Sequence, residues 1–100
     1  MTVTIHIVGL GPRFNQIFKP IMSKLIKHNK LEIGYIFSRD IKKAEDCSKF
    51  FKNGVPALFS NYKEKLSKLD KSDKNLILVN LPIKYKFETI AFALRNNIAV

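Results

Sequence analysis

Two glycines after an apolar segment are the first residues whose spacing could serve a chemical function. Residues 3–8 are largely apolar, and Gly9-Leu10-Gly11 follows them directly. In a dinucleotide-binding fold, the first glycine permits a tight turn, and the second lets the backbone approach a pyrophosphate at a helix N-terminus. Position 14, where that fingerprint has its third small residue, holds Phe14. The turn is therefore predicted either to bind a dinucleotide or to be a structural turn that binds nothing.

The remainder of this turn carries groups that suit a phosphate. Pro12 fits the first turn of a helix because no backbone donor is needed there, and the Arg13 side chain could lie along a phosphate. The candidate cofactor-binding residues of this turn are Gly9, Leu10, Gly11, Pro12, Arg13 and Phe14.

A second candidate loop follows the apolar residues 31–37. Folds that prefer NAD usually place a carboxylate there, which accepts a hydrogen bond from the ribose 2′-hydroxyl. This chain has Ser38 and Arg39 instead, and Asp40 two residues on is expected to cap the next helix. A hydroxyl and a guanidinium suit a 2′-phosphate. The loop thus predicts NADP as the cofactor, with NAD as the alternative, unless Arg39 is simply a solvated loop residue.

The third candidate loop includes Leu81 and Pro82, at the end of the most apolar segment of the chain, residues 75–81. A proline at this place turns the chain across the expected cofactor site. No residue is assigned a catalytic role, and no metal site is expected. The single cysteine, Cys47, has no second cysteine for a disulfide or a metal site. We expect it in the core of a protein from a reducing, cytoplasmic setting.

Apolar periodicity places these loops between alternating strands and helices. The expected strands are residues 2–8, 31–37, 55–59, 75–81 and 98–100, and the expected helices are 14–28, 41–52, 62–69 and 87–95. Residues 70–74 are expected to form a loop. This alternation predicts one α/β domain over residues 1–100, a Rossmann-like, doubly wound parallel sheet with helices on both faces.

Three details of these elements are also predicted. Pro20 falls inside the first helix and should kink or loosen it. Pro56 should confine its strand to an edge of the sheet, because proline cannot donate to a ladder. His6 and His28 are expected to be surface residues and not ligands.

The net charge of +10 raises nucleic acid as a partner. The basic residues are mostly lysines scattered along the polar sides of the expected helices, whereas nucleic-acid binders concentrate arginines and aromatic residues in one patch. Composition therefore argues against nucleic acid. The chain has no run of about eighteen apolar residues, so no membrane span is expected.

Five segments in order resemble the glucose-fructose oxidoreductase, inositol dehydrogenase and rhizopine-catabolism (Gfo/Idh/MocA) family. They are residues 8–11 (VGLG), 18–20 (FKP), 36–45 (IFSRDIKKAE), 54–62 (GVPALFSNY) and 81–91, which begin with LP. The chain is also similar to the thiazolinyl imide reductases around residues 13–14 and 54–56. The resemblance implies a Rossmann domain that binds NAD(P) in an oxidoreductase acting on a carbonyl, alcohol or imine.

The chain departs from the family pattern at several positions. Phe14 replaces a small residue, Lys86 stands near the place of a histidine, and Asn97 stands where a glycine is usual. The chain ends at Val100, before the position of the family's catalytic lysine and before its substrate domain. The resemblance therefore implies a cofactor-binding fragment that is inactive alone.

Two functions follow as alternatives. The first is the NADP(H)-binding portion of an oxidoreductase, and the second is a non-catalytic nucleotide-sensing or protein-interaction module. In either case, an incomplete sheet edge and uncovered apolar helix faces predict association with a second copy or with the missing C-terminal domain.

Overall fold

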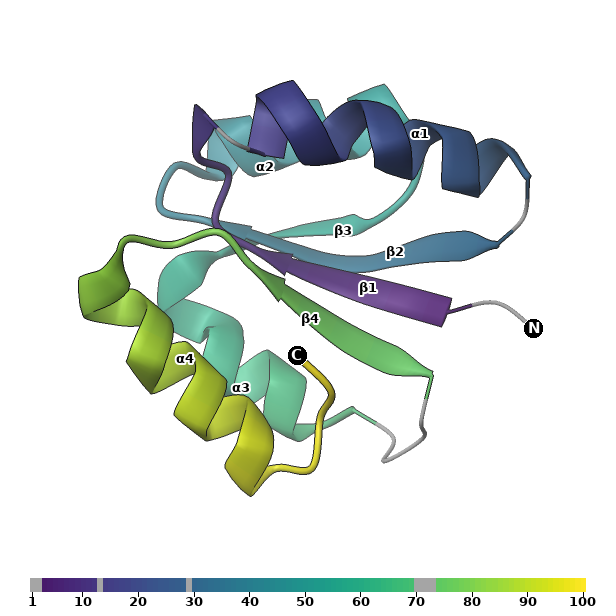
Figure 1. The fold of residues 1–100 in the computed structure, drawn as a ribbon. Helices are drawn as coiled ribbons and strands as arrows, with labels where there is room; N and C mark the ends of the chain where they lie inside the picture. Colours follow the sequence, from purple (N-terminus) through teal and green to yellow (C-terminus); the bar gives the residue numbers. More distant parts are fainter. Residues whose placement is uncertain (1–2, 13, 29, 70–73) are drawn as a thin grey trace.

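Strands and helices alternate along the chain in the computed structural model, which describes residues 3–12, 14–28, 30–69 and 74–100. Figure 1 shows the arrangement. In chain order the elements are β1 (Val3–Val8), the π-helical turn η1 (Phe14–Phe18), α1 (Lys19–Lys27), β2 (Leu31–Ser38), α2 (Ile41–Phe51), β3 (Val55–Leu58), the 3₁₀ turn η2 (Phe59–Asn61), α3 (Tyr62–Ser67), β4 (Asn75–Val79) and α4 (Ile83–Arg95).

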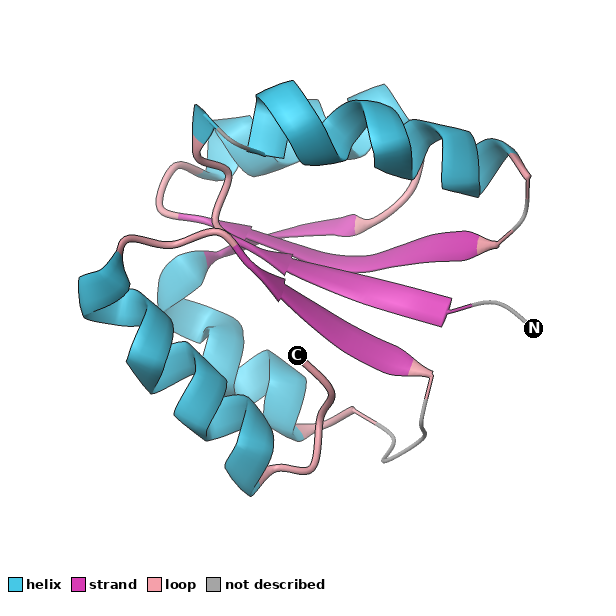
Figure 2. Ribbon diagram, viewed as in Figure 1, coloured by secondary structure: helices cyan, strands magenta, loops and turns pink. Residues whose placement is uncertain are grey.

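The sheet has the strand order β3-β2-β1-β4, and every ladder between these strands is parallel. Helices α1 and α2 cover one face, and α3 and α4 cover the other (Figures 1 and 2). The prediction of a Rossmann-like, doubly wound α/β fold is thus confirmed. Pro56 lies in the edge strand β3, as predicted. The strand expected at 98–100 is reduced to a single parallel bridge between Ala99 and Leu76.

Neighbouring residues of the central strands enter opposite cores. Ile7 and Ile36 belong to the core under α1 and α2, while Val8 and Phe37 belong to the core under α3 and α4. All four side chains are completely buried. Strands that are buried on both faces must be apolar at consecutive positions, which explains why these segments read as continuous apolar runs and not as strict alternation.

The first helix begins as a π-helical turn and becomes α-helical at Lys19. Pro20 is therefore near the start of α1, where a missing backbone donor is tolerated. The helix changes from π-helical to α-helical directly before Pro20.

His6 is buried, with 2% of its surface exposed, so its expected surface position is wrong. It lies where β2 has one residue more than β1, since Ile5 pairs with Ile33 but Ile7 pairs with Ile36. The His6 Nδ1 accepts a hydrogen bond from the backbone N–H of Tyr35 at 3.0 Å. The imidazole thus takes the place of a backbone acceptor at this irregularity of the sheet.

Candidate functional site

The parallel register brings the three predicted loops together at the carboxyl ends of the strands. Val8 at the end of β1 pairs with Phe37 of β2 and with Val79 of β4. The backbone N–H of Gly9 donates to the Phe37 carbonyl at 3.0 Å, and that of Asn80 donates to the Val8 carbonyl at 2.8 Å. β1 is also the strand at which the chain order reverses, and ligands of doubly wound sheets bind at the strand ends there.

Gly9 is required by the fold itself. Its φ of +96° lies in the region that side chains rarely adopt, and a Cβ built on it would lie 2.5 Å from the Asn80 carbonyl oxygen. This contact is with backbone, which cannot move aside cheaply. Gly9 therefore lets the β1 and β4 loops meet, and its presence alone says nothing about a ligand.

Gly11 is different, because nothing in the fold requires a glycine at that position. Its φ lies outside the left-handed region, and the nearest atom to a Cβ built on it is the Asn80 carbonyl oxygen at 3.8 Å, an ordinary contact. An alanine would fit. The missing side chain leaves the backbone of the turn open to approach from outside, as a phosphate-binding turn requires.

Phe14 fills the place of the third small residue with a completely buried ring. The ring packs edge-on against Phe51 of α2, with 6.3 Å between ring centroids. Phe14 is the first residue of the π-helical turn η1. Its backbone N–H donates to the Gly11 carbonyl at 3.0 Å and so closes the glycine turn. The large side chain is thus accommodated in the core and does not fill the space above the glycines. Arg13 lies outside the described residues.

The loop after β2 is organised by two local hydrogen bonds. Asp40 accepts from the Lys42 N–H at 3.0 Å and is the N-cap of α2, which confirms the predicted cap. The buried Ser38 accepts from the Asp40 N–H at 3.2 Å, so part of its hydrogen-bonding capacity is used within the loop.

Arg39 is exposed and lies across the ring of Tyr85 from α4, 4.4 Å from the ring centroid. Hydrogen bonding with Arg39 and its positive charge lower the pKa of the Tyr85 hydroxyl, and the charge of Lys84 adds to this effect. Phe59 packs edge-on against the same ring. These side chains form a polar and aromatic wall beside the loop of β2.

The β4 loop contributes a group that sequence reasoning missed. The side-chain nitrogen Nδ2 of Asn80 is buried and has no hydrogen-bond partner among the described residues. Buried amides are normally paired, so an unpaired one at a strand end is a donor available to a ligand. Only its position beside Gly9 and Gly11 in space makes it notable.

Two cavities flank the glycine turn and share Gly11, Asn80, Leu81 and Pro82. The cavity on the β2 side, called here the β2-side cavity, has a volume of about 210 Å³ and is also lined by Ser38, Arg39, Lys43 and Phe59. The β4-side cavity has a volume of about 440 Å³ and is also lined by Pro12, Phe18, Val79 and Lys86. Nine of the ten predicted site residues are described, and eight of these line one or both cavities. Phe14, the ninth, does not line either of them.

The charged residues around both cavities are all basic. Arg39 and Lys43 line the β2-side cavity and Lys86 lines the β4-side cavity, whereas no carboxylate or histidine is found among the described lining residues. Such a lining attracts anions and offers no carboxylate or imidazole for proton transfer. Lys43, Asn80 and Lys86 were not predicted as site residues, because their loops and helices are brought together only by the fold.

Comparisons with protein-family models, with curated proteins and with solved structures find no match for the chain. In the described part of the chain, no group of three or more histidine, cysteine, aspartate or glutamate residues could hold a metal ion. None of the helices among those residues is long and apolar enough to cross a membrane. The candidate site is thus described by the fold and the two cavities. It is an open glycine turn between two cavities with basic lining residues, in a Rossmann-like domain.

Proposed function

We propose that this chain binds a dinucleotide across its glycine turn, NADP(H) in preference to NAD(H). The observation that carries the proposal is the bare backbone at Gly11, for which the fold offers no other reason. The pyrophosphate would lie over Gly11, and the two halves of the dinucleotide would occupy the cavities on either side. The unpaired Asn80 amide would donate to the ligand.

The preference for NADP(H) rests on the charges of the β2-side cavity. Arg39 and Lys43 line it, and no acidic residue that could accept from a ribose 2′-hydroxyl is found among its described lining residues. Asp40 is engaged as the helix cap. Arginine and lysine are the side chains that pair with phosphate oxygens.

In an oxidoreductase the bound nicotinamide supplies hydride transfer, to or from a carbonyl, alcohol or imine. The described residues that line the cavities would bind and orient the cofactor, and they include no histidine or carboxylate that would complete a proton relay. Binding without turnover would equally suit a nucleotide-sensing module, which is the second candidate. A readout of hydride transfer in the presence of candidate substrates separates the two.

Calorimetric titration with NADPH and with NADH tests the proposal, with the Gly11→Val variant as the key comparison. Because a Cβ at position 11 meets only an ordinary contact, we expect the variant to fold, and its unfolding temperature is measured before the affinities are compared. We expect saturable binding of both nucleotides to the wild type, and at least about tenfold weaker binding to the variant, since its side chain occupies the approach to the backbone.

Arg39→Asp should weaken NADPH binding, and Lys30→Asp is its matched control. The two substitutions change the net charge equally, but Lys30 precedes β2 at the opposite end of the sheet and lines neither cavity. Equal weakening by both would mean that only the overall charge matters. Absence of binding by the wild type at millimolar nucleotide would refute the proposal.

A further inference from the structure

Among the described basic residues that line the two cavities, Lys86 of α4 is the one to which the proposed function gives no role. It is partly buried and lines the β4-side cavity. The other residues that line this cavity and not the β2-side cavity are apolar: Pro12, Phe18 and Val79. Lys86 forms no ion pair with any residue that the structure describes. Charges withdrawn from water into apolar surroundings are normally paired, so this lysine indicates an anionic ligand.

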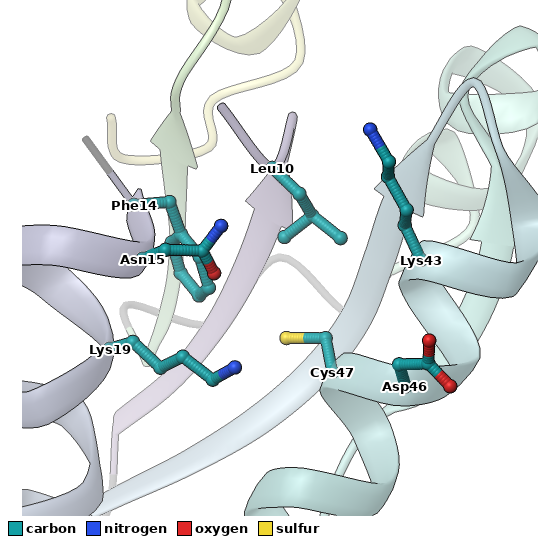
Figure 3. Close-up of a pocket in the computed structure, with 7 residues that line it drawn as sticks. All are labelled: Leu10, Phe14, Asn15, Lys19, Lys43, Asp46 and Cys47. Carbon is teal, nitrogen blue, oxygen red and sulfur yellow. The ribbon is translucent and has the colours of Figure 1, made fainter. Parts of the chain in front are cut away.

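Lys19, another lysine near the glycine turn, has different surroundings. It lines a third cavity, beside η1, α1 and α2, with a volume of about 220 Å³ (Figure 3). Asp46 lines the same cavity, and the Lys19 ammonium lies 4.1 Å from the centroid of the Phe50 ring. Figure 3 shows Lys19 directed toward Cys47, whereas Lys43 is directed away from it. The charges of this third cavity are thus partly balanced and do not converge on one point.

The start of α4 adds to the positive charge around Lys86. The N-cap residue Pro82 lines the β4-side cavity and has no side-chain acceptor for the first backbone N–H groups of the helix. The first turn contains Lys84 and Lys86 and no acidic residue. Cations at this end of a helix are unfavourable, because they face the positive end of the helix dipole. An anion in the cavity would relieve this repulsion.

The dinucleotide does not itself supply this anion in the proposed arrangement. Its pyrophosphate would lie over Gly11, which both cavities share, and its extra phosphate would lie beside Arg39 and Lys43 on the β2 side. The half that enters the β4-side cavity consists of ribose and nicotinamide, and the oxidised nicotinamide ring carries a positive charge. Because like charges repel, Lys86 beside this ring is favourable only when an anionic ligand accompanies the cofactor.

We infer that the β4-side cavity takes a small carboxylic acid together with the nicotinamide, and that Lys86 holds its carboxylate. The inference rests on the proposed function and names the substrate class of the oxidoreductase. The two halves of a dinucleotide are similar in size, but this cavity has a volume of about 440 Å³ against about 210 Å³ on the β2 side. The larger cavity therefore has room for a second molecule.

The lining narrows the class of acid. Lys86 and the nicotinamide would share one cavity, so the carbonyl carbon that accepts the hydride must be close to the carboxylate. A 2-oxo acid meets this condition, and an apolar side chain on it would pack against Phe18 and Val79. Its reduction moves a hydride from NADPH to the carbonyl carbon and a proton from solvent to the carbonyl oxygen, which gives the 2-hydroxy acid and NADP⁺.

NMR titration of the wild type with pyruvate and with phenylpyruvate, at saturating NADP⁺, tests the inference. NADP⁺ cannot reduce either acid, so binding is observed without reaction. We expect both acids to shift the backbone amide signals of Val79 and Lys86 saturably, and we expect their neutral methyl esters to leave these signals in place.

The Lys86→Gln variant should bind both acids about ten- to a hundredfold more weakly, the range typical for hydrogen bonds to charged groups. Its affinity for NADPH, measured by calorimetry, should stay within twofold of the wild type. Lys84→Gln is the matched control, because it removes the same charge from the same helical turn but Lys84 lines neither cavity.

Equal binding of acids and esters, equal effects of the two variants, or no binding of either acid beside bound NADP⁺ would overturn the inference and leave dinucleotide binding intact. An equal loss of NADPH and NADH affinity in Lys86→Gln would also overturn it, because Lys86 would then hold the cofactor. If the wild type binds neither dinucleotide, the proposed function is refuted, and the inference with it.

Discussion

The two glycines of the β1 turn have different causes, although they look alike in the sequence. Gly9 is needed because its backbone adopts a positive φ against the β4 loop, while Gly11 has room for a Cβ within the fold. Sequence reasoning could place both in a turn, because glycines after an apolar strand indicate one. It could not separate the structural glycine from the open one, since that depends on the position of the Asn80 carbonyl, which follows a distant strand.

The other polar residues of the site were missed for the same reason. Asn80 belongs to no recognisable motif, and Lys43, although it lies in the segment 36–45, was not predicted to line the site; each acquires significance only from neighbours on other strands and helices. Tyr85 was likewise not predicted to meet Arg39, which is 46 positions earlier in the chain. By contrast, Ser38, Arg39, Leu81 and Pro82 were predictable because they directly follow apolar strands.

The surroundings of His6 lead us to expect that the stability of the protein depends on pH. Its Nδ1 accepts from the Tyr35 N–H, so its Nε2 carries the proton and donates to the Asn75 side-chain oxygen at 2.9 Å. A charged imidazole carries a hydrogen on both nitrogens and cannot accept at Nδ1. Burial lowers the pKa of His6 below its usual value, and the hydrogen bond with Asn75 opposes this effect only in part.

We therefore expect the His6 contribution to stability to be complete above about pH 6.5. It should be lost as the pH falls from there through the lower pKa of the folded state. Between these two values only the unfolded chain takes up the proton readily, which favours unfolding. Urea unfolding between pH 7.5 and 5 measures this decline. The decline should be shallower in His6→Gln and unchanged in His28→Gln. An NMR titration midpoint for His6 at or above 6.5 would contradict the prediction.

At the level of elements, the apolar pattern predicted helices better than it predicted the surfaces they bury. Residues 87–94 were correctly placed in a helix, but α4 packs against the sheet through Thr89 and Ala93, while Phe87 and Leu94 are exposed. Periodicity shows that a helix has an apolar face without showing what covers it. The π-helical turn η1 was not predicted either, because apolar periodicity does not distinguish a single π-helical turn from the first turn of an α-helix.

The N-cap of α2 gives a prediction about an element as a whole. Asp40→Ala removes the acceptor for the Lys42 N–H, and we expect the free energy of unfolding to fall by about 1 kcal/mol. Asp40→Asn is the matched control, because asparagine caps helices as well as aspartate does. Chemical denaturation measures both. If Asp40 also held a ribose hydroxyl, Asp40→Asn would weaken nucleotide binding while keeping the stability, a result that would contradict its assignment as a cap alone.

For the whole molecule, the most exposed apolar surface is a row along α4. Ile83, Phe87 and Leu94 are 70%, 73% and 66% exposed, and they follow the helical spacing that places them on one face. The corresponding row on η1 and α1, formed by Ile17, Ile21 and Leu25, is covered more fully. Exposed apolar rows of this kind mark contact surfaces, so we expect two copies of the chain to associate through α4.

Sedimentation velocity at micromolar concentration tests this association. Phe87→Lys should shift a dimeric wild type to monomers, because it places a charge in the centre of the row. Ile21→Lys makes the same kind of change on the opposite layer and should leave the dimer intact. A monomeric wild type, or equal effects of both substitutions, would exclude an α4 interface.

His6 and Gly34 fit together so closely that position 34 has no room for a side chain while the imidazole is present. A Cβ at position 34 would lie 2.3 Å from the imidazole, and loss of the imidazole would leave the Tyr35 N–H without its acceptor. During divergence, position 34 can therefore gain a side chain only after position 6 has lost its imidazole. Distant descendants that keep the imidazole at position 6 should therefore also keep glycine at position 34, even where their surfaces have changed beyond recognition.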